Sequence, residues 1–281
     1  MIWSRGEILP DDGLVILASD RTFEHGLGLF ETLRTWRGRA PLLGAHRARI
    51  LRSAGALRLP IDPASFPDDR AVARLLGAEG IGGDRILRIT TSGGSEATLP
   101  VVWMRSGPLP PPPAEGGLTV ELGGWEVASS DPMARHKSLN YWSRRLAFEA
   151  ARARGHDEAL SLVDGFGFGE GSRANLFVVR RDELMTPSLT APIVPGVIRG
   201  LVLELARGEA LAVREVGPIP PGVLREADEV FLTNAVRGIM PVARARGADP
   251  KWSMTWPSPG RWTARLRDLV LDRMEPAGAS P

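Results

Sequence analysis

The chain has 281 residues, a formal net charge of +2 and 43% hydrophobic residues, which are ordinary values for a globular protein with a sizeable core. Arginines alternate with acidic residues instead of forming a basic cluster, so we expect no nucleic-acid partner. The sequence has no cysteine, no apolar run of about 18 residues, no signal-peptide layout and four histidines without metal-ligand spacing, which predicts a cytoplasmic protein without disulfides, membrane spans or a bound metal.

The first part of the chain is predicted to contain strands and one long helix. The apolar spacing at 43–58 is that of a helix, and the glycine-bearing segment at 20–28 predicts a turn. Alternating or continuous apolar runs predict strands at 14–17, 30–36, 85–91 and 99–104. The segment PLPPPPAEGG at 108–117 is stiff and cannot form a central strand, which is typical of a spacer between domains.

The second part of the chain alternates strands with helices. Helices are predicted at 139–154, closed by Gly155 as a cap, and at 196–207. Strands are predicted at 118–122, 158–163, 175–180 and 228–233. We therefore expect an α/β (α+β) fold with a smaller N-terminal domain at 1–110, a linker at 111–117, a larger C-terminal domain at 118–274 and a disordered tail at 275–281.

Lysine is rare in this sequence. Of the 35 basic residues only Lys137 and Lys251 are lysines, and a genome rich in arginine codons explains the general depletion. Such a drift spares lysine where a guanidinium cannot replace it, because only an amine can lose its proton and attack a carbonyl carbon. Lys251 is predicted to lie on the surface. Lys137 lies beside Tyr141, the only tyrosine, which makes Lys137 the candidate for covalent chemistry.

Five segments, in this order and spacing, resemble the class IV aminotransferases, the pyridoxal 5'-phosphate (PLP) enzymes of fold type IV. They include DRTFEHGLGLFETLR, KSLNYWSRRLAFEA, FGEGSRANLFVV and EADEVFLTNAVRGIMPV, and together they span 20–34, 46–57, 137–179, 186–206 and 226–242. The resemblance implies a two-domain fold with the cofactor in the interdomain cleft. It also implies a homodimer in which loops of the partner help to close the site.

The resemblance assigns roles to three residues. Lys137 would hold PLP as a Schiff base and shuttle the substrate's α-proton, Glu170 would pair with the pyridine nitrogen, and Tyr141 would bond the phenolic oxygen. Tyr141 lies four positions after Lys137, so the two would share a helix face. The alternatives are a surface lysine at a helix start, a turn carboxylate in a glycine-rich corner and a half-buried aromatic residue.

The resemblance also implies a phosphate site. Arg49, in the HRAR element, would offer paired donors to the phosphate, although this pattern alone would fit a solvated helix face. Backbone N–H groups of Val197, Ile198, Ala235 and Val236 would complete the site, the first two at a helix N-terminus. Many relatives have threonine at the position of Ile198, so one hydroxyl is missing here.

The substrate stays open at this stage. Arg34 and Arg237 are the available carboxylate anchors, and Arg173 could reach the substrate or face solvent. The segment FETLR at 30–34 departs from the FEGIR of branched-chain members, and no arginine-x-histidine pair of the D-amino-acid members follows 85–91. The segment NAVRGIMPV at 234–242 is closer to aminodeoxychorismate lyases.

The lead hypothesis is a PLP-dependent aminotransferase that moves an amino group between an amino acid or amine and a 2-oxo acid. The alternative is aminodeoxychorismate lyase of folate biosynthesis, which converts 4-amino-4-deoxychorismate into 4-aminobenzoate and pyruvate through the same cofactor contacts. The remote alternative is a non-catalytic PLP- or nucleic-acid-binding protein, which the filled positions of Lys137, Glu170 and Arg49 disfavour.

Overall fold

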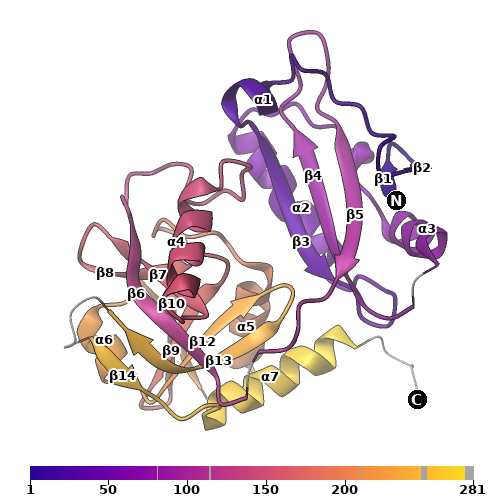
Figure 1. Ribbon diagram of the computed structural model, residues 1–281. Helices are drawn as coiled ribbons and strands as arrows, with labels where there is room; N and C mark the ends of the chain where they lie inside the picture. The colour runs from indigo at the N-terminus through magenta and orange to yellow at the C-terminus, as the bar shows by residue number, and fades with distance from the viewer. Residues whose placement is uncertain (81, 114, 210, 248–251, 276–281) are drawn as a thin grey trace. The chain divides into compact units, whose positions relative to one another are not determined.

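The structure is a computed structural model that describes residues 1–80, 82–113, 115–209, 211–247 and 252–275. The chain divides into two compact units (Figure 1). The first unit comprises residues 1–110, 136–140 and 273–281, and the second comprises 111–135 and 141–272. The chain therefore leaves the first unit after Pro110, returns to it for five residues around Lys137, and leaves it again. The sequence-based boundaries place those five residues in the C-terminal domain instead.

The first unit is built on an antiparallel five-stranded sheet with the strand order β2-β1-β5-β4-β3. Helix α2 packs against the edge strand β3, and α3 contacts β1, β2 and β5 (Figure 1). The strands are β1 (Ile2–Ser4), β2 (Glu7–Leu9), β3 (Gly28–Arg34), β4 (Arg85–Ser92) and β5 (Val102–Pro108). The helices are α1 (Arg21–His25), α2 (Leu43–Ala56) and α3 (Asp69–Glu79), with a 3-10 turn at Pro63–Ser65.

The segment 136–140 extends the edge of this sheet. The Phe30 N–H donates to the Lys137 carbonyl at 2.9 Å, and the Leu139 N–H donates to the Gly28 carbonyl at 3.0 Å. A Cβ on Gly28 would lie 2.6 Å from Leu139 Cδ1, so this close approach requires glycine. The predicted helix start at 139 is therefore wrong, because these backbone groups already pair with β3.

The second unit is a nine-stranded sheet with the main strand order β11-β10-β9-β12-β13-β6-β7-β8, to which β14 adds on β13. The strands are β6 (Leu118–Val127), β7 (Glu158–Val163), β8 (Gly167–Gly171), β9 (Asn175–Arg180), β10 (Glu183–Pro187), β11 (Ala212–Val216), β12 (Glu229–Asn234), β13 (Gly238–Arg246) and β14 (Ser253–Thr255). The helices are α4 (Trp142–Ala153), α5 (Val197–Arg207), α6 (Pro221–Arg225) and α7 (Arg261–Met274), and the last two residues of α7 fall in the first unit.

Strand β8 also pairs with β9, at Glu170 and Asn175. This contact joins the end of the strand path back onto β9, so the strands from β9 to β8 close into a ring. Every second residue of these strands contributes to one apolar core, as the period of a strand requires. The core side chains include Leu118, Val120, Leu122, Leu176, Val178, Val230, Leu232, Met240 and Val242.

Several predicted elements are confirmed. The strands at 158–163 and 175–180 match β7 and β9 residue for residue, and α5 begins one residue after the predicted helix. Gly155 has the left-handed φ of 81° that a helix end favours. The strand predicted at 14–17 is wrong: Val15 is 75% exposed, and no described strand includes this segment.

Two expectations fall outside the described residues. Lys251 and all of the predicted tail except Glu275 belong to segments that the structure does not describe. In the described part of the chain, no helix combines the length and the apolar character that a membrane span needs.

The buried carboxylate of Glu229, in β12, caps the N-terminus of α7, and we expect its loss to destabilise the protein. Glu229 accepts hydrogen bonds from the N–H groups of Trp262 at 2.9 Å and Thr263 at 2.7 Å, and from the Thr263 hydroxyl at 2.7 Å. Glu229→Ala should lower the free energy of unfolding by about 1–3 kcal/mol in urea titrations, because buried donors lose their acceptor. The control Glu226→Ala removes a 59% exposed carboxylate that pairs with Arg180, and it should cost under about 1 kcal/mol. Equal losses in the two variants would contradict this role for Glu229.

Candidate active site

The first group of candidate residues lies in the first unit, where α2 meets β3. Glu31 is buried at the centre of β3 and receives a bidentate ion pair from Arg49 of α2, with Nε–Oε1 at 2.8 Å and a second contact from Nη2 to Oε2. His46, one turn earlier on α2, places Nδ1 2.7 Å from Glu31 Oε2. The predicted phosphate arginine is therefore buried and oriented by a carboxylate, not solvated on a helix face.

These contacts shift two pKa values. Burial would raise the pKa of Glu31, but Arg49 and His46 outweigh it and bring the pKa down to about 2. Burial lowers the pKa of His46, whose Nε2 is buried without a hydrogen-bond partner in the described structure. The cluster therefore holds an ionised carboxylate, a guanidinium and a neutral imidazole near pH 7.

Lys137 also belongs to the first unit. Its backbone is held by β3, its side chain is half-buried, and Nζ lies 4.3 Å from the centroid of the Phe30 ring. The Arg88 guanidinium lies 3.9 Å from the centroid of the same ring. The preceding residue, His136, bonds the Ser53 hydroxyl of α2 at 3.0 Å. The backbone of Lys137 is thus fixed by β3, and the ring that its amine contacts also meets Arg88, a cation that sequence reasoning missed.

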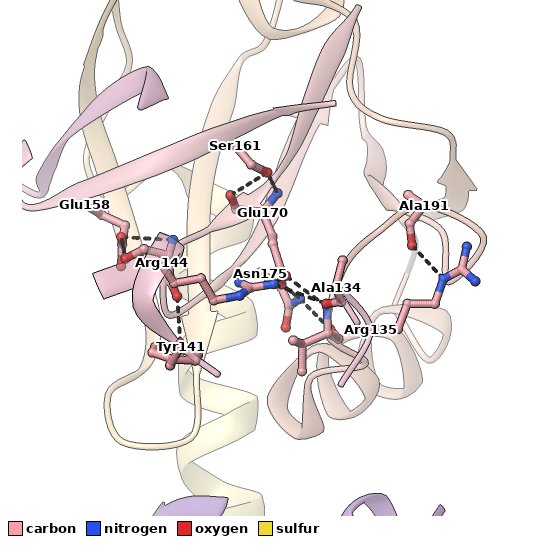
Figure 2. A network of polar contacts seen from close by, with 11 residues as sticks. Ala134, Arg135, Tyr141, Arg144, Glu158, Ser161, Glu170, Asn175 and Ala191 are labelled. Carbon is pink, nitrogen blue, oxygen red and sulfur yellow. Dashed lines mark hydrogen bonds and ion pairs between the residues drawn. The ribbon is translucent and has the colours of Figure 1, made fainter. Parts of the chain in front are cut away.

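The second group lies in the second unit and surrounds Glu170 (Figure 2). Glu170 is 2% exposed, and its Oε1 accepts from Arg144 Nη2 at 2.5 Å and from the Val194 N–H at 3.0 Å. Its Oε2 accepts from Asn175 Nδ2 at 3.0 Å. A cation and two neutral donors therefore hold this carboxylate in its charged form. It is a fully buried group, not the turn carboxylate that its glycine-rich surroundings allowed.

Arg144 is the residue that sequence reasoning missed in this group. It lies in the first turn of α4 and also donates to the Ala134 carbonyl at 3.2 Å. Burial would lower the pKa of Arg144, but the attraction of Glu170 outweighs it and raises the pKa. The adjacent Arg145 is 64% exposed and pairs with Glu149 on the same helix. Two consecutive arginines on a helix are typical of a solvated face, so the pattern gave no sign that one is buried.

Tyr141 precedes α4 and belongs to the second unit, so the expected helix face shared with Lys137 does not exist. Its hydroxyl donates to the Ser172 carbonyl at 2.7 Å. Burial raises the pKa of Tyr141 to about 12. A phenol has one proton, so donation to a cofactor oxygen would require Tyr141 to release Ser172.

The backbone N–H groups predicted to bind the phosphate lie in the second unit. Helix α5 begins at Val197 after Gly196, and its second residue, Ile198, is buried. The described residues supply no side-chain cap to the first N–H groups of α5, which favours an anion there. In the turn after β12, Asn234 Oδ1 accepts from the Val236 N–H at 3.1 Å, so that predicted donor is already bonded, while Ala235 lies in the same turn, half-buried.

The three candidate substrate arginines all have partners. Arg34 pairs with Asp84 at 3.3 Å. It lies at the end of β3, about 13 Å along the strand from Phe30, which bonds to the Lys137 carbonyl. Arg173 stacks on Phe148 at 3.4 Å and lies 3.6 Å from Glu158. Arg237 donates to the Pro111 carbonyl at 2.9 Å, and burial lowers its pKa, with repulsion from Arg173 adding to the effect. Their roles in substrate binding stay predictions.

The sequence model of the amino-transferase class IV family matches residues 28–245, which is most of the chain. The chain belongs to the class IV aminotransferases. A Thermotoga maritima protein named a probable branched-chain-amino-acid aminotransferase is 30% identical over 277 residues, covering 95% of this chain and 94% of its own.

Solved structures of two kinds share the fold. The crystal structure of the branched-chain aminotransferase from the thermophilic archaeon Thermoproteus uzoniensis with norvaline matches with a TM-score of 0.83 and 26% identity, covering 97% of this chain and 95% of that one. The crystal structure of 4-amino-4-deoxychorismate lyase from Pseudomonas aeruginosa matches with a TM-score of 0.79 and 28% identity, covering 97% and 98%. The expected α/β fold class is confirmed, and the chain is an enzyme of this family.

The low pKa of Glu31 predicts how stability depends on pH. The pKa is about 2 in the folded protein against an ordinary 4.5, so the ionised form stabilises the fold above pH 4.5 and this contribution is lost as the pH falls toward 2. In urea titrations from about pH 6 to pH 3, wild type should therefore lose stability more steeply than Glu31→Gln. Glu31→Gln should already be less stable at pH 7, because Arg49 loses its buried counter-ion.

The exposed Glu24 provides the matched control. Its side chain is 54% exposed beside His25, so Glu24→Gln should keep the wild-type slope. Parallel pH curves for wild type and Glu31→Gln would show that Glu31 is not held ionised by the cluster.

Proposed function

We propose that this enzyme binds PLP and moves an amino group between an amino acid or amine and a 2-oxo acid, with Lys137 as the residue that bonds the cofactor. The observation that carries the proposal is the fixed position of Lys137, whose backbone bonds to β3 and whose amine lies over the Phe30 ring. An amine must lose its proton to act as a nucleophile or base, and burial in general favours that loss.

The residues of the second unit fit the pyridine and phosphate groups of PLP. Thr233 pairs with Asn175 across β12 and β9, so the two side chains share a face, and Thr233 Oγ1 is buried without a partner among the described residues. A Cβ on Gly196 would lie 1.9 Å from Asn175 Oδ1, so α5 can begin this close only at a glycine. The side of the sheet that carries Asn175 therefore has three features together. They are the Thr233 hydroxyl, the N-terminus of α5 and the buried carboxylate of Glu170.

Each protein group has a defined task in the proposed reaction. When bound, PLP supplies the electron sink for the bond that breaks at the substrate α-carbon. Glu170 would offer a fixed negative charge to the pyridine nitrogen, while Arg49 and the N–H groups of Val197 and Ile198 would bind the phosphate. Lys137 Nζ would accept the α-proton of the substrate and deliver it to the C4′ carbon of the cofactor.

The rival within the family is aminodeoxychorismate lyase, which the similarity to the Pseudomonas aeruginosa enzyme keeps open. It would use the same cofactor contacts and break a different bond. The family resemblance also supports a homodimer, which we include in the proposal.

Borohydride reduction tests the assignment of Lys137. Reduction of the purified protein should fix the cofactor to the peptide that contains residue 137, as mass spectrometry can show. Lys251→Arg should keep the label, and Lys137→Arg should lose it, because a guanidinium does not condense with the aldehyde. A label on Lys251 in the wild type would overturn the assignment.

The two reactions differ in their need for an amino acceptor. For a transaminase, a good amino donor alone should bleach the visible absorption of the bound cofactor, and a 2-oxo acid should restore it, as ping-pong kinetics requires. A lyase regenerates its starting form in every turnover and needs no 2-oxo acid. We expect bleaching in a panel of L- and D-amino acids. No bleaching, together with conversion of 4-amino-4-deoxychorismate into pyruvate, would replace the transferase by the lyase.

A further inference from the structure

The ion pair between Arg144 and Glu170 has an effect beyond stability. Resting on the proposed function, we propose that Arg144 is a positioning residue that weakens the hold of Glu170 on a proton at the pyridine nitrogen of the cofactor. The structure places a permanent positive charge 2.5 Å from the carboxylate that would face this nitrogen. Arg144 would thus set the strength of the electron sink without touching the substrate.

Glu170 has hydrogen-bond donors besides Arg144. Val194 and Asn175 already give it neutral donors on both oxygens, each at 3.0 Å. Arg144 adds charge, and its side chain is only 11% exposed, so water screens that charge little. The same nitrogen, Nη2, also donates to the Ala134 carbonyl at 3.2 Å, which helps to keep the charge in place (Figure 2).

The sign of the effect follows from the charges. A proton on the pyridine nitrogen is positive, so Glu170 attracts it and Arg144 repels it. A carboxylate paired with a guanidinium therefore favours the protonated ring less than the same carboxylate alone. Among the described residues, the other titratable groups that act on Arg144 are Tyr141, which is neutral near pH 7, and Glu158, which faces Arg173 at 3.6 Å. Neither replaces the charge of Arg144.

The experiment uses PLP labelled with ¹⁵N at the ring nitrogen, bound to the full-length enzyme, with the ¹⁵N chemical shift followed against pH. Arg144→Gln should raise the pKa of the ring nitrogen by about one unit or more, because it removes a nearby positive charge that repels the proton. Arg145→Gln, at the exposed neighbour, should leave it unchanged. Glu170→Gln should lower it.

Two further variants separate charge from folding. Arg144→Lys keeps a cation and should restore the wild-type pKa of the ring nitrogen, whereas a purely structural role would leave it shifted as in Arg144→Gln. In urea titrations of the protein without cofactor, Glu170→Gln should be less stable than the double variant Arg144→Gln/Glu170→Gln, because the single variant leaves a buried guanidinium without its counter-ion.

The outcomes distinguish this inference from the proposed function. If the pKa of the ring nitrogen changes in Glu170→Gln but not in Arg144→Gln, the role of Arg144 is overturned and the proposed function stays intact. A bound cofactor whose nitrogen ignores both variants overturns the contact with Glu170. Failure of the wild type to bind PLP overturns the proposed function and this inference together.

Discussion

A carboxylate that is buried away from water is stabilised by a cation and N–H donors. Glu170, in the second unit, has both. Glu170 is contacted by Arg144 from α4, by Asn175 from β9 and by the backbone of Val194 before α5. The same residue makes the β8–β9 pairing that closes the ring of strands. Fold closure and the proposed cofactor contact thus depend on one buried charge, because moving any of these elements would remove one of the donors that hold it.

The first unit repeats the arrangement with other residues. Glu31 of β3 is met by Arg49 and His46 of α2, so the packing of helix on strand is fixed by a bidentate pair as well as by apolar contacts. Arg49 is buried and the side chain of Arg144 is only 11% exposed, although arginine is the residue type that sequence reasoning places at the surface. In a chain with only two lysines, the planar guanidinium of arginine forms these buried ion pairs.

Sequence reasoning could predict elements whose pattern is local. The strands β7 and β9 are continuous apolar runs between clear breaks, and the order of motifs was enough to recognise the family. It missed β8, because the glycines of GFGEG favour turns. It also began α4 at 139 instead of 142, because pairing of this segment with β3 depends on residues far away in the chain. The partner of Glu170 on α4 escaped for the same reason, since burial of Arg144 and not of Arg145 is decided by tertiary packing alone.

The return of the chain to the first unit around Lys137 has a consequence for the order of events during synthesis. Phe30 bonds to Lys137, and about a hundred residues separate them along the chain. The edge of β3 can therefore be completed only after all of β6 and the loop that follows it have left the ribosome. Contacts at such separations carry a high loop-closure entropy and form late. The residue proposed to bind the cofactor is thus among the last parts of its own unit to find its place.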